Sequence, residues 1–262
     1  MSLPNKSHGR KSISASVKPR DLMGQDERLA HVWTADIITL FPDSFPGVLG
    51  QSLTGRALTE GKWALSITDL RLFGDGKHKN VDDTPAGGGA GMVLRADVVG
   101  KAIDHVLRLQ KTKKNLIFLS PRGQVFNQNM ANEWIQGAGV ILLAGRFEGV
   151  DQRVIDHYGI QEVSLGDFVM SGGEIAAQAM IDACVRLLPG VLGNAASIDQ
   201  ESHQHGLLEH PQYTRPNEWN GRTIPDVLLS GNHQKIDEWR RSESEELTKT
   251  RRPDLWSAFK PR

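Results

Sequence analysis

Apolar runs of strand length alternate with amphipathic segments along most of the chain. The runs that predict buried strands are Trp33–Leu40, Trp63–Leu70, Leu116–Ser120, Gly139–Ala144 and Glu162–Leu165. The segments that predict helices are Leu53–Leu58, a stretch beginning at Asp97, Asn127–Gln136, Val150–Tyr158 and Gly173–Leu188. Strands that are apolar throughout are typical of a parallel sheet buried on both faces. The alternation therefore predicts an α/β fold with a mainly parallel sheet and helices on both faces.

Two finer predictions concern the third strand and the helix before it. Pro121 is expected to end that strand at Ser120, because proline cannot donate to a sheet ladder. The preceding helix is expected to bury one apolar face. The members of this face are Val99, Ile103, Val106 and Leu107.

A long polar segment follows the second strand. Residues 74–85 carry almost no apolar side chains, and a glycine cluster, 87–91, comes soon after them. So polar a segment is unsuited to a core, and it predicts a long exposed loop. Long loops frequently carry function.

The two ends of the chain differ from the middle. Residues 1–20 are basic and serine-rich with no acidic residue, which favours a disordered extension over 1–31 rather than an organellar transit peptide. Residues 32–192 contain the predicted sheet. The polar segment 193–205 predicts a flexible linker or lid, and 206–262 predict a small helical domain.

The amino-acid composition excludes several classes of protein. Basic and acidic side chains balance at 31 each, which argues against a general polyanion-binding protein. A single cysteine excludes a disulfide framework and a cysteine-rich zinc module. No stretch approaches the ~18 consecutive apolar residues of a membrane span, and no secretory signal is present. Together these features predict a soluble, cytoplasmic protein.

Glycine-marked turns follow three predicted strands, at 119–123, 145–151 and 165–174. In open α/β sheets, ligands bind at the carboxyl ends of the strands. These turns lack the G-x-G-x-x-G pattern of dinucleotide sites and the Gly-Lys-Ser/Thr of a P-loop. They suit a neutral or zwitterionic adenosine compound held by backbone groups. Tight turns alone would explain the glycines equally well.

Eight motifs in these regions resemble one family. They are TGRAL (54–58), VDDTPAGGGAGM (81–92), LSPRG (119–123), GRFEGVDQRV (145–154), SLGDFVMSGGE (164–174), LLPGVLG (187–193), GLLEHPQYTRP (206–216) and VLLSGNH (227–233). In order and spacing, residues 32–256 resemble the bacterial tRNA (guanine-N1)-methyltransferases of the TrmD type. Ala86 and Ala90 stand where that family commonly has Tyr and Pro.

The resemblance implies a methyltransferase of the SPOUT class, with a deep trefoil knot in residues 32–192 and a tRNA-binding domain in 206–262. It implies S-adenosylmethionine as methyl donor and N1 of guanine 37, in the tRNA anticodon loop, as acceptor. It also implies a homodimer with its active site at the subunit interface. The family is described as helped by Mg²⁺, although no residue of this sequence is assigned to a metal.

The resemblance also implies site residues. The donor-binding positions fall on Phe118, Leu119, Pro121, Gly145, Phe147, Glu148, Gly149, Ser164, Leu165, Gly166, Asp167, Phe168, Val169, Met170, Gly172 and Gly173. The family's essential arginine falls on Arg186. Its general base, usually an aspartate, falls on Glu201, and Asp199 is the rival candidate.

The implied reaction accounts for these residue types. Guanine N1 carries a proton and is a poor nucleophile until a base such as Glu201 removes it. A fixed guanidinium, here Arg186, can stabilise the negative charge that develops on guanine O6. Glu148 can accept hydrogen bonds from the guanine N1/N2 edge. Without the resemblance, Glu201 would be interpreted as a solvated carboxylate and Arg186 as a helix-end arginine.

Several alternatives stay open. A knotted methyltransferase acting on another target, such as a ribose 2′-oxygen, would not need the linker carboxylate. A non-catalytic RNA-binding relative would keep the nucleoside pocket without turnover. Three histidines, at 203, 205 and 210, suggest a metal cluster but match no standard zinc spacing. The candidate contacts with RNA phosphates are Arg215 beside Tyr213, Lys235, Arg240, Arg241, Arg251 and Arg252.

Overall fold

A five-stranded parallel sheet forms the centre of the computed structural model, which describes residues 32–193, 201–203 and 206–259. The strand order is β2-β1-β6-β5-β7, and every neighbouring pair is parallel. The strands are β1 (Trp33–Thr39), β2 (Trp63–Asp69), β5 (Asn115–Val125), β6 (Gly139–Ala144) and β7 (Gln161–Ser164). The parallel sheet predicted from the apolar runs is confirmed.

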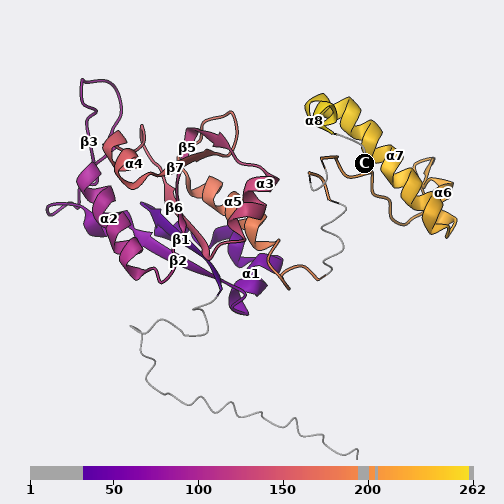
Figure 1. Cartoon of the computed structure of the whole chain (residues 1–262), viewed down its shortest axis with the longest axis horizontal. Coiled ribbons are helices and arrows are strands. Elements are labelled where there is room, and N and C mark those ends of the chain that lie inside the picture. The colour runs from indigo at the N-terminus through magenta and orange to yellow at the C-terminus, as the bar shows by residue number, and fades with distance from the viewer. Residues whose placement is uncertain (1–31, 194–200, 204–205, 260–262) are drawn as a thin grey trace, which may run out of the picture.

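Helices cover both faces of this sheet (Figure 1). One face packs against α1 (Ser52–Thr59), α3 (Gln128–Trp134) and α5 (Glu174–Val185), and the other against α2 (Ala96–Leu109) and α4 (Gln152–Tyr158). Strand β6 shows why both faces need a cover, because all six of its residues are apolar or glycine and are buried. Val140 and Leu142 belong to the core on the α5 side, whereas Ile141 and Leu143 belong to the core on the α2 side, as the period of two in a strand requires.

Strand β5 differs from the prediction because it does not end before Pro121. It continues to Val125, and its register against β7 shifts between Leu119 and Gln124, both of which lie opposite Val163. Residues 120–123 therefore bulge out of the ladder. A bulge removes the need for a ladder hydrogen bond from proline, so the strand resumes pairing beyond it.

Helix α2 buries a slightly different face from the one predicted. Val99, Ile103 and Val106 are buried, but Leu107 is 40% exposed. The buried stripe is completed by Val98 and Ala102. At about 100° per residue, Leu107 falls just beyond the edge of that stripe, so its assignment to the core was wrong.

The loop after β2 is exposed along most of its length, as predicted, but one residue anchors it. Val81 is buried, and its carbonyl accepts a hydrogen bond of 2.9 Å from the Arg95 amide. Beside it, β3 (Asp82–Asp83) pairs antiparallel with β4 (Val93–Leu94). The glycine cluster 87–91 is thus held at both ends by strand pairing.

The chain after residue 206 contains helices, as predicted, and a hairpin that was not predicted. The helices are α6 (Asp226–Leu229), α7 (His233–Arg251) and α8 (Pro253–Ala258), and the hairpin joins β8 (Glu218–Trp219) to β9 (Arg222–Thr223). Helix α7 contacts both other helices, and Figure 1 shows the three together.

None of the described helices has the length and apolarity needed to cross a bilayer. The predicted extension 1–31 and most of the predicted linker 193–205 lie outside the described residues.

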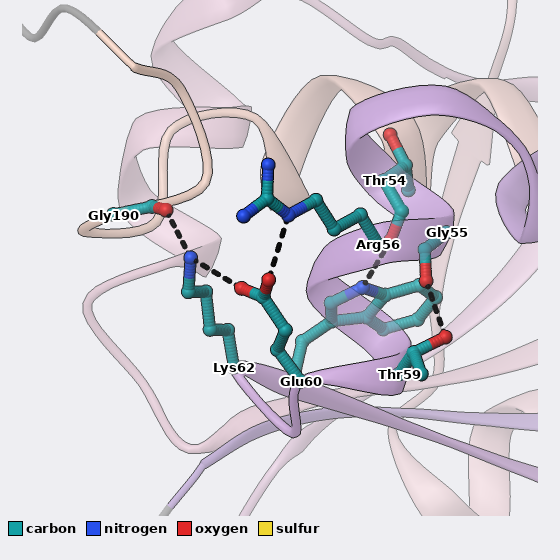
Figure 2. A network of polar contacts seen from close by, with 8 residues as sticks. Thr54, Gly55, Arg56, Thr59, Glu60, Lys62 and Gly190 are labelled. Atoms are coloured by element: carbon teal, nitrogen blue, oxygen red, sulfur yellow. Dashed lines mark hydrogen bonds and ion pairs between the residues drawn. The ribbon is translucent and has the colours of Figure 1, made fainter. Parts of the chain in front are cut away.

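Polar contacts fasten α1 to its surroundings (Figure 2). The indole of Trp63 in β2 donates 3.0 Å to the Thr54 carbonyl, and Lys62 donates to the Gly190 carbonyl beyond α5. Glu60 pairs with Lys62 at 2.8 Å and with Arg56 at 2.6 Å, and these bonds lower the pKa of its carboxyl to about 2. The short 3-10 turns beside these elements are Pro42–Ser44, Gly47–Gly50 and Leu70–Phe73.

Gly139 begins β6 in a conformation that only glycine adopts easily. Its φ is +139°, and a Cβ there would overlap the Thr34 carbonyl oxygen of β1. Gly139→Ala is therefore expected to lower the free energy of unfolding by about 2–4 kcal/mol, measured by urea denaturation. Gly137→Ala is the matched control, because the nearest atom to its Cβ would be the Trp134 carbonyl at 3.7 Å. Equal stability of the two variants would contradict the strain argument.

Candidate functional site

A cavity of about 330 Å³ lies where β5, β6 and β7 end. Its walls come from residues 118–122, 145–149, 163–165 and 168–173, together with Ala176 at the start of α5. The three glycine-marked turns, which are far apart in sequence, therefore meet at one place. They meet because the carboxyl ends of neighbouring parallel strands share an edge of the sheet.

Most positions implied by the resemblance line this cavity. Those that do are Phe118, Leu119, Pro121, Gly145, Phe147, Glu148, Gly149, Ser164, Leu165, Phe168, Val169, Met170, Gly172 and Gly173. Gly166 and Asp167 are not among the lining residues. Gly166 instead shapes the third turn, since its carbonyl accepts a hydrogen bond of 2.9 Å from the buried Ser164 hydroxyl. Six further lining residues are absent from the set that the resemblance implied, namely Ser120, Arg122, Arg146, Val163, Ser171 and Ala176. The first three and Ser171 lie in the predicted turns.

Arg146 is the most informative of the lining residues to which the sequence analysis assigned no role. Its Nη2 lies 2.7 Å from Oε2 of Glu174, and its Nη1 donates 3.1 Å to the Ser171 carbonyl. Its guanidinium carbon also lies 4.3 Å from the ring centre of Phe41, within the range of a cation–π contact. A Cβ on Gly172 would overlap this guanidinium. Arg146 thus joins the second turn to the third.

Glu174 is the buried carboxylate that holds Arg146. It opens α5, and its side chain is only 4% exposed. Besides Arg146, it accepts a hydrogen bond of 2.7 Å from Thr39 at the end of β1. A carboxylate in the first turn of a helix is further stabilised by the helix dipole. An arginine two residues after a buried strand and a glutamate after Gly-Gly were the available sequence signals for this pair.

Glu148 places a carboxylate in the wall of the cavity. Its backbone amide donates 2.9 Å to the Met92 carbonyl, and Leu94 bridges to Val150 two residues later. The end of the glycine-rich loop is therefore fixed beside the second turn. Phe147, just before Glu148, has a positive φ of 58° and an exposed ring, a strained conformation of the kind that clusters at functional sites.

Arg186 and Glu201 form an ion pair outside the cavity. Arg186 follows the last residue of α5, and its two terminal nitrogens lie 2.7 Å and 2.5 Å from the two carboxylate oxygens of Glu201. Hydrogen bonding to Glu201 raises the pKa of the Arg186 guanidinium above its usual value. The rival base, Asp199, lies outside the described residues. The structure thus brings the arginine and Glu201 together, but neither of them lines the same cavity as Glu148.

The described histidines form no metal centre. Nδ1 of the buried His210 lies 3.1 Å from the Pro211 carbonyl, and His205 falls outside the described residues. Within the ranges that the structure describes, three or more His, Cys, Asp or Glu side chains nowhere gather as a metal-binding group requires. The one cysteine, Cys184, is buried in α5, and burial raises the pKa of its thiol to about 12.

The cavity is suited to a small ligand that combines a ring with a charged group. Phe118, Leu119 and Leu165 offer apolar surface, and the turn backbones offer hydrogen-bonding groups. Two cations in the wall are already paired, Arg146 with Glu174 and Arg122 with Glu162 at 2.9 Å. The carboxylate of Glu148 is thus left to meet a positive charge on the ligand.

Comparisons with known proteins identify the family of this chain. The model of a family described as tRNA (Guanine-1)-methyltransferase TrmD matches residues 33–258. A protein of Ruegeria sp. (strain TM1040) named tRNA (guanine-N(1)-)-methyltransferase is 64% identical over 240 residues, which are 92% of this chain and 98% of the relative. Proteins with the same name from Ruegeria pomeroyi and Nitrobacter winogradskyi are 67% and 58% identical, over 86% of this chain and 93% and 94% of theirs. These matches show that the chain belongs to the TrmD family of tRNA (guanine-1)-methyltransferases.

Proposed function

We propose that this protein is a tRNA (guanine(37)-N1)-methyltransferase that uses S-adenosylmethionine. The observation that carries the proposal is the cavity at the ends of β5, β6 and β7, lined by the glycine-marked turns and by Glu148, in a chain of the TrmD family. The acceptor position, guanine 37 of the anticodon loop, follows from the motifs shared with that family.

The residues present fit S-adenosylmethionine. Its adenine ring needs apolar walls, which Phe118 and Leu165 supply, and its positive charge suits the carboxylate of Glu148. The glycine at position 145 keeps the cavity open beside Phe118, because a Cβ on Gly145 would lie 2.6 Å from the Phe118 ring. When bound, S-adenosylmethionine supplies an electrophilic methyl group. The protein's own task is then to orient guanine and to accept its N1 proton.

Three side chains divide that task. Glu201 accepts the N1 proton and thereby makes N1 nucleophilic. Arg186, already held beside Glu201, stabilises the charge that forms on guanine O6. Glu148 accepts hydrogen bonds from the guanine edge at the wall of the cavity. No described residue group offers a site for Mg²⁺, so a magnesium requirement stays a prediction of the resemblance.

The positions of these groups support a homodimer. The cavity touches the start of α5 at Gly173, whereas Arg186 follows its end. At ~1.5 Å per residue these two points lie about 20 Å apart, which is too far for one chain to hold guanine between them. A second copy that faces the cavity would bring its own Arg186 and Glu201 to it. The exposed apolar side chains of Val169 and Ile175, 84% and 65% exposed beside the cavity, suit such an interface.

The proposal includes the finer architecture of the family. We infer that residues 32–192 form a SPOUT domain whose three turns belong to a deep trefoil knot. Residues 206–262 form the tRNA-binding part, joined by the segment 193–205, and the enzyme works in the cytoplasm. The exposed basic side chains Arg215, Lys249 and Arg251 support RNA contact by this C-terminal part.

Methyl transfer to two tRNA transcripts that differ only at position 37 tests the proposal. Labelled S-adenosylmethionine is expected to label the G37 transcript and not the A37 transcript, and nucleoside analysis should place the label at guanine N1. Label on both transcripts or on a ribose would move the function to another RNA target. Donor binding without label on any tRNA would favour a non-catalytic RNA-binding relative.

A further inference from the structure

The hairpin of β8 and β9 presents an exposed tryptophan. The Trp219 side chain is 66% exposed and lies directly opposite Arg222 across the antiparallel pair. Among the described residues, the Trp219 indole takes part in no hydrogen bond, aromatic pair or cation–π contact. The remaining hairpin side chains, of Glu218, Arg222 and Thr223, are exposed as well. Packing within the described chain therefore does not explain why a large apolar ring stands at this exposed position.

The turn that carries the indole is tightly specified. Its two central residues, Asn220 and Gly221, have φ values of 52° and 73°. Positive φ at both positions is the requirement of a type I′ hairpin turn, and Asn-Gly is its preferred sequence. Below the turn, the Ile224 amide donates 3.0 Å to the Asn217 carbonyl. The ring is thus displayed on a short, ordered support, so little conformational entropy is lost when it meets a partner.

The segment that precedes the hairpin along the chain also carries aromatic and guanidinium groups. Tyr213 is 48% exposed, its ring centroid lies 6.1 Å from that of Trp239, and Arg215 follows two residues later. Within the described part of the chain, neither Arg215 nor Arg222 forms an ion pair. Exposed aromatic rings interleaved with free guanidinium groups characterise surfaces that bind unpaired nucleotides, because bases stack on the rings and phosphates pair with the cations.

We propose that Trp219 and Arg222 form a stacking platform for an unpaired nucleotide of the tRNA substrate, with the base on the indole and a phosphate on the guanidinium. This inference rests on the proposed function, which supplies an RNA as the partner. It adds a contact that is separate from the methyl-transfer cavity. The platform acts in binding alone, so its loss leaves the chemical step intact.

Trp219→Ala tests the stacking contact. The variant is expected to weaken tRNA binding about 5- to 100-fold, the range for loss of one base–aromatic stack, and to raise KM for tRNA with little change in kcat. Affinity for S-adenosylmethionine is expected to stay unchanged. Trp219→Phe should recover most of the binding, because it keeps a π-face. Leu229→Ala is the matched control, since it removes another exposed apolar side chain, 54% exposed, from the neighbouring α6.

Arg222→Ala separates the phosphate contact from the stack. It should reduce the slope of log K against log salt by about 0.7, as expected for one phosphate contact with a single strand, whereas Trp219→Ala should leave that slope unchanged. Direct tRNA binding serves as readout even if the wild-type enzyme methylates another position, which keeps this test apart from that of the proposed function. Equal tRNA affinity of Trp219→Ala and Leu229→Ala would overturn the proposal. So would a changed oligomeric mass of Trp219→Ala, because the ring would then cover a second copy of the chain.

Discussion

Replacing Glu201 with Gln is expected to lower kcat for methyl transfer to the G37 transcript by about 10²–10⁴-fold, the usual contribution of a placed general base. Glutamine keeps the shape of glutamate and one of its two hydrogen-bond acceptors toward Arg186, but it does not accept the N1 proton at neutral pH. Single-turnover transfer measures the chemical step directly. Affinity for S-adenosylmethionine should be unaffected, because Glu201 is not among the donor-pocket residues of its own chain and the role proposed for it is toward guanine.

Two controls sharpen this prediction. Glu201→Asp keeps a carboxylate and should retain more activity than the Gln variant. Asp199→Asn removes the rival base and should have little effect. Full activity of Glu201→Gln together with loss in Asp199→Asn would transfer the role to Asp199.

Mixed dimers test whether the site is shared between copies. Gly145→Val should close the cavity against the Phe118 ring and, like Glu201→Gln, be inactive alone. In an equal mixture of exchanging subunits, half of the dimers are mixed, and each holds one intact site. About one quarter of the wild-type activity should then return, because a two-fold dimer has two equivalent sites. No recovery in a mixture proven to exchange would contradict the shared site.

Arg146→Met is expected to have the largest effect on stability. It strips the buried Glu174 of its charge partner and leaves Thr39 as its remaining hydrogen-bond donor. Removing one member of a buried ion pair costs about 3–5 kcal/mol, because the other charge is left uncompensated. Urea unfolding measures this loss. S-adenosylmethionine affinity should fall as well, since Arg146 also holds the Ser171 carbonyl in the wall of the cavity.

Arg153→Met provides the matched control for this pair. Arg153 lies seven residues later and pairs with Asp151 at 2.7 Å, but its side chain is 82% exposed. Loss of such a surface pair costs at most about 1 kcal/mol. The double variant Arg146→Met/Glu174→Gln should recover part of the lost stability, because no charge stays buried. If Arg146→Met were no less stable than Arg153→Met, the buried pair would not have the role assigned to it.

The local sequence pattern was sufficient to predict an element where every residue of that element has the same kind of surroundings. The apolar run Gly139–Ala144 predicted β6 with its observed bounds, because a strand buried on both faces needs every side chain to be apolar. The turns at 119–123, 145–151 and 165–174 predicted a shared ligand site, because parallel strands end at one edge. Pattern failed for Leu107 at the margin of a helical stripe and for Pro121, where pairing with β7 carried the strand through a bulge.

The amino-acid sequence by itself thus determined the α/β class, the order along the chain of the central-sheet strands and the helices that cover them, and the turns that carry the site. Tertiary structure alone decided that Arg146 meets Glu174, that Arg186 holds Glu201 away from the cavity, and that Trp219 stands exposed on a hairpin. The physical reason is the separation along the chain of the residues that interact. Periodicity reports the environment of near neighbours in an element, whereas an ion pair or an exposed ring depends on which distant segments the completed fold brings beside it.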